Sequence, residues 1–360
     1  MSKRDEESMT RRDLMKFAAA SAAATVAGSL PLAVSGANAA ETATRRRTRF
    51  LLDCHVHVGG SPGLKAMLDQ VQTPKDWLAL RGRQPEAFAA AASEPQEDNS
   101  DDLIAKMDEY GVTHALIQAT PGRNASNQMI ADAARRHKNR FFPIYRPEAL
   151  LGDLGTGSIE PPTREELHQN ARQVAENIEG LFPGLGMVGM WEFIVGGFVT
   201  SALDPIEVAR DMAPIMEALR PKKLPIQLPT GSSGWKGGLF YVYEPLWVDE
   251  LAGNFPDCPI VLTKMGRGIP TSFDACLVVA KRNANVYFDL TDSRAEHIRE
   301  AIDEIGAHRI MYGTDLHALS INYAQNVGFE IVDGAQPSEE EREWISWRTA
   351  DEVYQLGLAG

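Results

Sequence analysis

The sequence predicts an α/β protein folded as a (β/α)8 TIM barrel, and three observations carry this prediction. From about residue 50 onward, short apolar runs alternate with longer amphipathic stretches, which is typical of parallel strands that alternate with helices. Eight such runs fall within roughly three hundred residues, the length that a closed barrel needs. Several runs end in polar side chains, as barrel strands do at their functional edge. An open, doubly wound sheet is the structural alternative.

The predicted strands alternate with longer amphipathic or polar stretches along the chain. They comprise residues 50–57, 112–118, 140–145, 187–193, 225–228, 260–264, 286–290 and 309–312. Between the first two, residues 101–110 have apolar side chains at helical spacing, and Gly111 is suited to end that helix. Residues 74–100 are polar and irregular, so they are interpreted as an insertion or lid over one end of the barrel.

Composition limits the classes of partner. The chain has 360 residues, 44% of them hydrophobic, which is enough for one large barrel or two medium domains. Its formal net charge of -13 disfavours nucleic acid, because an acidic surface repels phosphate backbones. Three cysteines without paired spacing do not indicate a disulfide framework. Nucleic acid is therefore not the expected partner, and a homo-oligomer is compatible with the sequence. A small-molecule substrate is implied by the family resemblance given below.

The first forty residues have the order of an export signal. Arg11 and Arg12 precede an Ala-rich apolar stretch over residues 17–34, and residues 37–39 (ANA) offer a small-residue cleavage pattern. This order resembles a twin-arginine signal peptide. The prediction is a signal peptide over residues 1–40 and a barrel domain over 41–360, with the twin-arginine export machinery as partner and the periplasm as destination. An uncleaved membrane anchor is the alternative.

Polar side chains gather at the predicted ends of the first and last strands. His55 and His57 are two apart on one strand, so both face the barrel interior, where two imidazoles can clamp a metal. Asp315 directly follows the last apolar run and would face the same cavity. Packed or exposed histidines and a helix N-cap aspartate are the alternatives.

Four segments together resemble the amidohydrolase superfamily, in particular the amidohydrolase-related group (amidohydrolase 2). These are residues 53–57 (DCHVH), 107–112 (MDEYGV), 254–262 (NFPDCPIVL) and 309–315 (RIMYGTD). That group contains TIM-barrel hydrolases of small molecules and decarboxylases of the aminocarboxymuconate-semialdehyde type. The resemblance extends from about residue 50 to residue 358.

The resemblance implies a divalent metal, usually zinc, held by the first-strand histidines and the last-strand aspartate. At matching positions these are His55, His57 and Asp315. In the family the aspartate also takes a proton from the metal-bound water, whose pKa the metal lowers to about 7.

Two histidines that the family pattern contains are absent. Pro229 stands at the end of the fifth strand and Lys264 at the end of the sixth, each in place of a histidine. Glu192, at the end of the fourth strand, is a candidate for a further metal ligand. His317 and Gln227 are weaker candidates to replace a lost ligand.

Lys264 also suggests a different use of the site. An ammonium beside Asp315 and Glu192 would form ion pairs and repel a divalent cation. It could serve as an electrophile or proton donor toward a carboxylate substrate, or only neutralise buried carboxylates. Asp315 and Lys264 are therefore the predicted catalytic residues.

Tryptophans near the strand ends are candidates for the substrate pocket. Trp191 and Trp235 are the predicted substrate-binding residues, and Trp247 is a further candidate, since aromatic rings supply flat apolar contact. Core packing is the alternative for each. His114, which alternates with apolar residues, is interpreted as a packed side chain.

The function predicted from the sequence is a metal-dependent hydrolase of a C–N or C–O bond in a small carbonyl compound, with a partly altered metal site. The alternatives are a decarboxylase built on the same barrel and a non-catalytic barrel that binds a ligand.

Overall fold

The structure of the protein is a computed structural model. It describes residues 48–68, 94–120, 126–146, 188–191, 205–231, 243–317 and 330–360, with a few isolated positions between them. The predicted signal peptide, Glu192 and Trp235 lie outside the described residues, as does most of the predicted lid. In the described part of the chain, no helix combines the length and apolarity needed to cross a membrane.

Parallel strands form a nearly closed barrel, which confirms the predicted fold. Within the described residues the strand order is β8-β7-β6-β5-β4-β3-β2-β1-β9, and every pairing is parallel. The strands are β1 (Leu52–Val58), β2 (His114–Ala119), β3 (Phe141–Tyr145), β4 (Gly189–Trp191), β5 (Ile226–Pro229), β6 (Ile260–Thr263), β7 (Val286–Asp289), β8 (Ile310–Met311) and β9 (Leu316–His317).

The last strand of the barrel is interrupted where it meets the first. β8 pairs with β7, whereas β9 pairs with β1 through Val56 and His57. Between them, the backbone N–H of Cys54 donates a hydrogen bond to the carbonyl oxygen of Tyr312 at 2.9 Å. The short segment between β8 and β9 therefore leaves the sheet at its seam and carries Asp315, whose φ is 53°.

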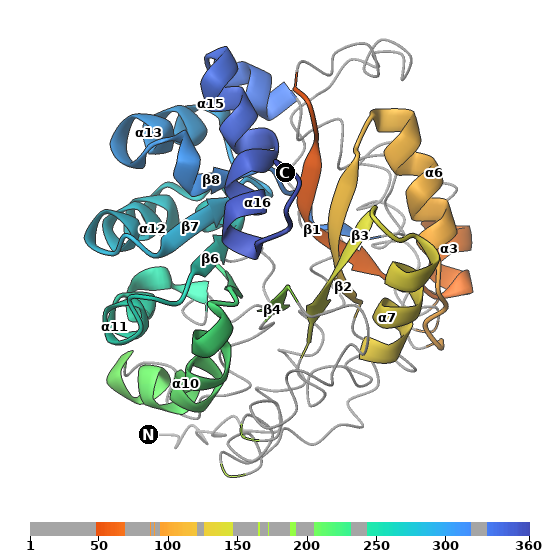
Figure 1. Ribbon diagram of the computed structural model, residues 1–360, viewed down its shortest axis with the longest axis horizontal. Helices are drawn as coiled ribbons and strands as arrows, with labels where there is room; N and C mark the ends of the chain where they lie inside the picture. The colour runs from red at the N-terminus through yellow and green to blue at the C-terminus, as the bar shows by residue number, and fades with distance from the viewer. Residues whose placement is uncertain are drawn as a thin grey trace, which may run out of the picture.

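Helices surround the barrel in chain order (Figure 1). One side carries α3 (Pro62–Leu68), α6 (Ser100–Tyr110) and α7 (Asn127–Arg136), and the other carries α10 (Pro205–Leu219), α11 (Val248–Asn254), α12 (Pro270–Arg282), α13 (Ala295–Ile305) and α15 (Glu339–Glu343). Local sequence sets their ends. Gly111, at φ 75°, ends α6 in the left-handed conformation that glycine favours. The Ser126 hydroxyl caps α7 by accepting a hydrogen bond from the Met129 N–H at 3.1 Å.

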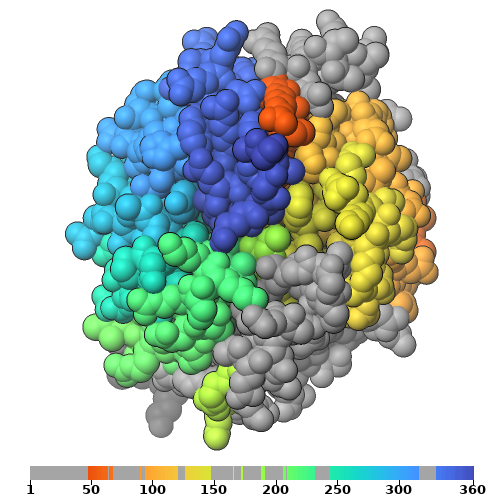
Figure 2. Space-filling model, viewed as in Figure 1, coloured from red at the N-terminus to blue at the C-terminus, as the bar shows by residue number. Residues whose placement is uncertain are grey.

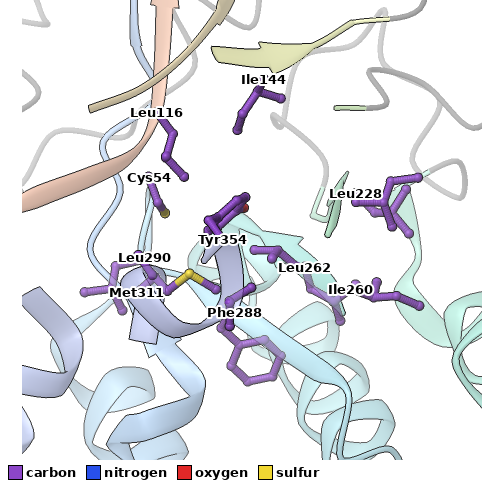
Figure 3. Packing of buried hydrophobic residues seen from close by; sticks show 14 of the residues in the cluster. Cys54, Leu116, Ile144, Leu228, Ile260, Leu262, Phe288, Leu290, Met311 and Tyr354 are labelled. Carbon is purple, nitrogen blue, oxygen red and sulfur yellow. The ribbon is translucent and has the colours of Figure 1, made fainter. Parts of the chain in front are cut away.

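The C-terminal helix α16 (Thr349–Tyr354) covers one face of the barrel, between the first strands and α10 (Figure 2). Its Tyr354 reaches the buried apolar cluster, where Figure 3 shows it among Cys54, Leu262 and Met311. The Nε2 of Gln227 donates hydrogen bonds to the Tyr354 hydroxyl and to the Cys54 carbonyl, both at 2.8 Å. The interior is thus packed with side chains, as is typical of a TIM barrel.

Candidate active site

His55, His57 and Asp315 meet at the seam of the barrel, as the sequence predicts. The Nε2 atoms of His55 and His57 each lie 3.2 Å from Oδ1 of Asp315. The histidine side chains are at most 1% exposed and that of Asp315 is 9% exposed. One ligand atom from each residue falls within 4.8 Å of the others, which is close enough to hold one metal ion.

Asp289, the last residue of β7, orients His55 from behind. Its Oδ2 lies 2.7 Å from Nδ1 of His55. Its Oδ1 accepts hydrogen bonds from the backbone N–H groups of Lys264 at 2.7 Å and Thr291 at 3.0 Å. A carboxylate on Nδ1 fixes the ring orientation and leaves Nε2 directed at Asp315.

Lys264 projects into the same cluster, which the sequence also predicts. Its ammonium contacts Oδ2 of Asp315, and its side chain is only 3% exposed. The two oxygens of Asp315 are therefore divided: Oδ1 faces the histidines and Oδ2 faces the lysine. Lys264 is also the first residue after β6 and has a φ of 70°, so the chain turns sharply where its side chain enters the site.

The charges of this cluster balance around His55. Burial of the ring disfavours its charged form, but the carboxylates of Asp315 and Asp289 outweigh burial and raise the pKa of His55 to about 9. Burial likewise disfavours the ionised form of Asp289, and the adjacent His55 nevertheless holds the pKa of that carboxyl below its usual value. Two basic side chains, His55 and Lys264, thus face two acidic ones, Asp289 and Asp315.

Asp53 and Thr314 join the two edges of the seam. Oδ2 of Asp53 accepts a hydrogen bond from the Thr314 hydroxyl at 2.6 Å, and Oδ1 accepts one from each of the His55 and Thr314 N–H groups at 3.1 Å. Burial raises the pKa of Asp53 to about 7, even though these hydrogen bonds oppose the shift. The pairing holds the segment before Asp315 against the strand that carries the histidines.

Further polar side chains at this edge were missed by sequence reasoning. Gln118, near the end of β2, is fully buried with its Nε2 3.4 Å from Nε2 of His57. Arg146 directly follows β3, is fully buried, and donates to the Ala119 carbonyl at 2.8 Å. Asp289 is the third such residue. Each ends or follows an apolar run, the same signal that drew attention to Asp315.

The remaining predicted residues divide between the core and the part that is not described. Pro229 ends β5 and offers no ligand atom, and Gln227 bonds to Cys54 and Tyr354 rather than joining the histidine cluster. Trp247 is buried in the apolar core. Only the backbones of Trp191 and His317 are described, in β4 and β9. The predicted roles of their side chains, like those of Glu192 and Trp235, lie outside the described residues.

The donor set fits a divalent metal with three protein ligands. Two imidazoles and one carboxylate are enough for a catalytic site. Asp289 already holds Nδ1 of His55 in the manner of an outer-shell partner. A ligating imidazole must be neutral at the ligating nitrogen, so metal binding would release the proton between His55 and Asp315. Lys264 opposes the cation by charge, although it occupies the oxygen of Asp315 that the histidines do not face.

A parallel barrel with a histidine pair, an aspartate and a lysine at the carboxyl ends of its strands defines the class as a TIM-barrel protein with an enzyme-type site. The sequence model of the amidohydrolase family, Amidohydro_2, matches residues 178–356. The chain resembles this family over the matched region, and Pro229 and Lys264 at the fifth- and sixth-strand ends differ from the family pattern.

The relatives include several decarboxylases. The chain is 25% identical over 328 residues to a gamma-resorcylate decarboxylase of Polaromonas sp., covering 78% of this chain and 91% of that protein. A solved dihydroxybenzoic acid decarboxylase of Polaromonas sp., with bound manganese and the inhibitor 2-nitroresorcinol, superposes with a TM-score of 0.53 at 18% identity. It covers 85% of this chain and 97% of the other. A manganese-bound 5-carboxyvanillate decarboxylase of Novosphingobium aromaticivorans has a TM-score of 0.57 at 14% identity, covering 86% and 98%.

Proposed function

We propose that this protein is a metal-dependent decarboxylase of a small aromatic carboxylic acid. The observation that carries the proposal is the contact of the Lys264 ammonium with Asp315 beside two buried histidines. Such a site offers positive charge for an anionic substrate and protons held at fixed atoms. The decarboxylases among the relatives support this reading over the hydrolase predicted first.

Decarboxylation requires a proton at the carbon that loses its carboxyl group. The C–C bond breaks, its electron pair stays on the ring carbon and takes up the proton, and carbon dioxide leaves. We assign proton donation to Lys264, which Asp315 holds in place. Lys264 and the fully buried Arg146 also favour entry of a carboxylate. A divalent metal on His55, His57 and Asp315 would supply a Lewis acid that binds substrate oxygens.

The test is carbon dioxide release from aromatic carboxylates, with 2,6-dihydroxybenzoate and 5-carboxyvanillate as first substrates. The purified protein is assayed with added Mn²⁺, with added Zn²⁺ and with a chelator, because zinc is the metal that the family resemblance implies. We expect decarboxylated product with metal and little with chelator. Hydrolysis of small amides or esters without any carbon dioxide release would favour the hydrolase instead.

We also propose that the protein is exported through the twin-arginine route, on the strength of Arg11 and Arg12 before the Ala-rich stretch. Replacing both arginines with lysine keeps the charge but removes the recognised pair. The precursor of this double variant should then accumulate in the cytoplasm, as measured by immunoblotting of cell fractions. Normal periplasmic accumulation of the variant would refute the proposal.

A further inference from the structure

The chain makes an unusual turn directly after β6. The five residues from Lys264 to Gly268 all have positive φ, at 70°, 41°, 76°, 54° and 66°. Three of these, Lys264, Met265 and Arg267, are not glycine, so the turn is strained. Strained backbone of this kind persists where the surrounding structure holds it and is concentrated at functional sites.

The end of β5 holds this turn in place. The Thr230 hydroxyl accepts a hydrogen bond from the Gly266 N–H at 2.9 Å. Gly231 is packed so closely that an added Cβ would lie 2.5 Å from the Gly266 carbonyl and 2.7 Å from Cβ of Arg267. Only glycine fits at position 231, and the side chain of Arg267 therefore starts beside the carboxyl end of β5.

Arg267 is buried with part of its guanidinium unpaired. Its side chain is 6% exposed, and its Nε donates to Oδ2 of Asp292 at 2.9 Å. Among the residues that the structure describes, its buried terminal nitrogen Nη2 has no hydrogen-bond partner. A buried N–H group without an acceptor costs free energy, so such a group in a rigid loop is available to a ligand.

Arg267 lies at the same end of the barrel as the candidate active site. Asp292, which holds it, follows β7, whose last residue Asp289 supports His55. Arg267 thus lies over the carboxyl ends of β5, β6 and β7. At this same edge of the barrel Lys264, three residues before Arg267 on the same turn, contacts Asp315. Two cations, Lys264 and Arg267, flank the half of the barrel mouth opposite the histidine pair.

We infer that Arg267 binds a second anionic group of the substrate, and that the preferred substrates are aromatic dicarboxylates rather than monocarboxylates. This inference rests on the proposed function, because it takes the first carboxylate to lie at the Lys264–Asp315 cluster. A planar guanidinium whose Nε is already fixed by Asp292 presents its terminal N–H groups in a set direction, which suits a carboxylate. The pairing with Asp292 alone does not account for the unpaired nitrogen, since that contact uses Nε.

Binding of two simple probes tests the inference without relying on turnover. Benzoate carries one carboxylate and isophthalate carries two, and their affinities are measured by calorimetric titration at equal metal content. The wild-type protein should bind isophthalate at least about tenfold more tightly than benzoate. Arg267→Gln should reduce isophthalate affinity to the level of benzoate and leave benzoate affinity unchanged within about twofold. Arg267→Lys, which keeps the charge, should retain part of the preference.

Arg299→Gln is the matched control, since Arg299 on α13 also pairs with carboxylates but lies away from the strand ends. It should leave the affinity ratio unchanged. Equal affinities for the two probes in the wild type, no binding of either, or a preference that survives in Arg267→Gln would each overturn the inference. If Arg267→Gln does not fold, the wild-type ratio and the lysine variant still decide. If the wild type prefers isophthalate and Arg267→Gln loses that preference, but the wild type releases no carbon dioxide from any substrate, only the proposed function is refuted.

Discussion

The two halves of the barrel mouth differ in what they contribute to the site. The half formed by β1 and the β8–β9 seam supplies His55, His57 and Asp315, all of which can ligate a metal. The half formed by β5 and β6 supplies Pro229, which cannot ligate through its side chain, and Lys264, which repels a cation. This barrel therefore has side chains that could hold a metal on one half of its mouth and positive charge on the other.

Asp315 connects the two halves, because one of its oxygens faces the histidines and the other contacts Lys264. Any cation bound between the histidines must share this carboxylate with the ammonium. The comparison thus depends on Asp315, and the first two predictions below each change the charge balance around it.

The largest effect is expected from Asp315→Asn, which removes the carboxylate shared by both halves. The Lys264 ammonium and the His55 imidazolium would then be buried without it, and the free energy of unfolding should fall by about 3 kcal/mol, as measured by urea denaturation. Adding Lys264→Met to this variant should restore part of the loss. The control is Asp102→Asn, since Asp102 pairs with Lys65 and both side chains are about half exposed. A loss no larger than that of the control, expected to be under about 1 kcal/mol, would contradict the prediction.

A smaller effect is expected from Lys264→His, which makes the β5–β6 half resemble the other. The substitution removes a cation and adds a ligand, so Zn²⁺ and Mn²⁺ should each bind about tenfold more tightly, as measured by competition with a chelating dye. Lys281→His, at an exposed position on α12, is the control and should bind as the wild type does. Unchanged or weaker binding by Lys264→His would show that the lysine does not oppose the metal.

The smallest effect concerns the opposite end of the barrel, where a histidine is shifted in the other direction. Burial, with a contribution from Arg140, lowers the pKa of His114 to about 4. Between pH 6.5 and about pH 4, His114 is protonated in the unfolded chain but stays neutral in the folded protein. Stability from the neutral ring is therefore full above pH 6.5 and is lost as the pH falls toward about 4.

The variant His114→Phe should accordingly lose less stability on acidification. Between about pH 7 and about pH 4.5, its free energy of unfolding should fall by on the order of 1 kcal/mol less than that of the wild type. His308→Gln, at an exposed position, is the control, and its free energy of unfolding should change with pH as that of the wild type does. If the free energy of unfolding of His114→Phe depends on pH as that of the wild type does, the prediction is wrong and folding does not disfavour protonation of His114.

The sequence predicts the strands well because each is a short apolar run, and the sixth illustrates both the success and its limit. Residues 260–264 were expected, and β6 spans Ile260–Thr263. Lys264 instead begins the left-handed turn, which depends on packing against Gly231 and on the hydrogen bond to Thr230, neither of which local patterns contain. The last strand was expected over residues 309–312, and β8 spans Ile310–Met311. The short strand β9 (Leu316–His317), which pairs with β1 across the seam, was not expected.

The candidate site was predictable where a pattern marked it. His55, His57, Asp315 and Lys264 come together as expected. Asp289 was missed because residues 286–290 were taken as one strand, so its side chain was not recognised as a strand-end group. Its importance follows from the orientation of the His55 ring, which no spacing reveals.

The hydrogen bonds of Gln227 have a consequence for how the barrel folds. This side chain joins the Cys54 carbonyl, 173 residues earlier, to the Tyr354 hydroxyl, 127 residues later. These contacts close very long loops of chain, and folding slows as the sequence separation of native contacts grows. We expect the interior to reach its final packing late and slowly, after the strands have paired with their sequence neighbours. Until then Gln227 and the apolar side chains around it stay accessible to water, and in that interval the chain is most prone to aggregate.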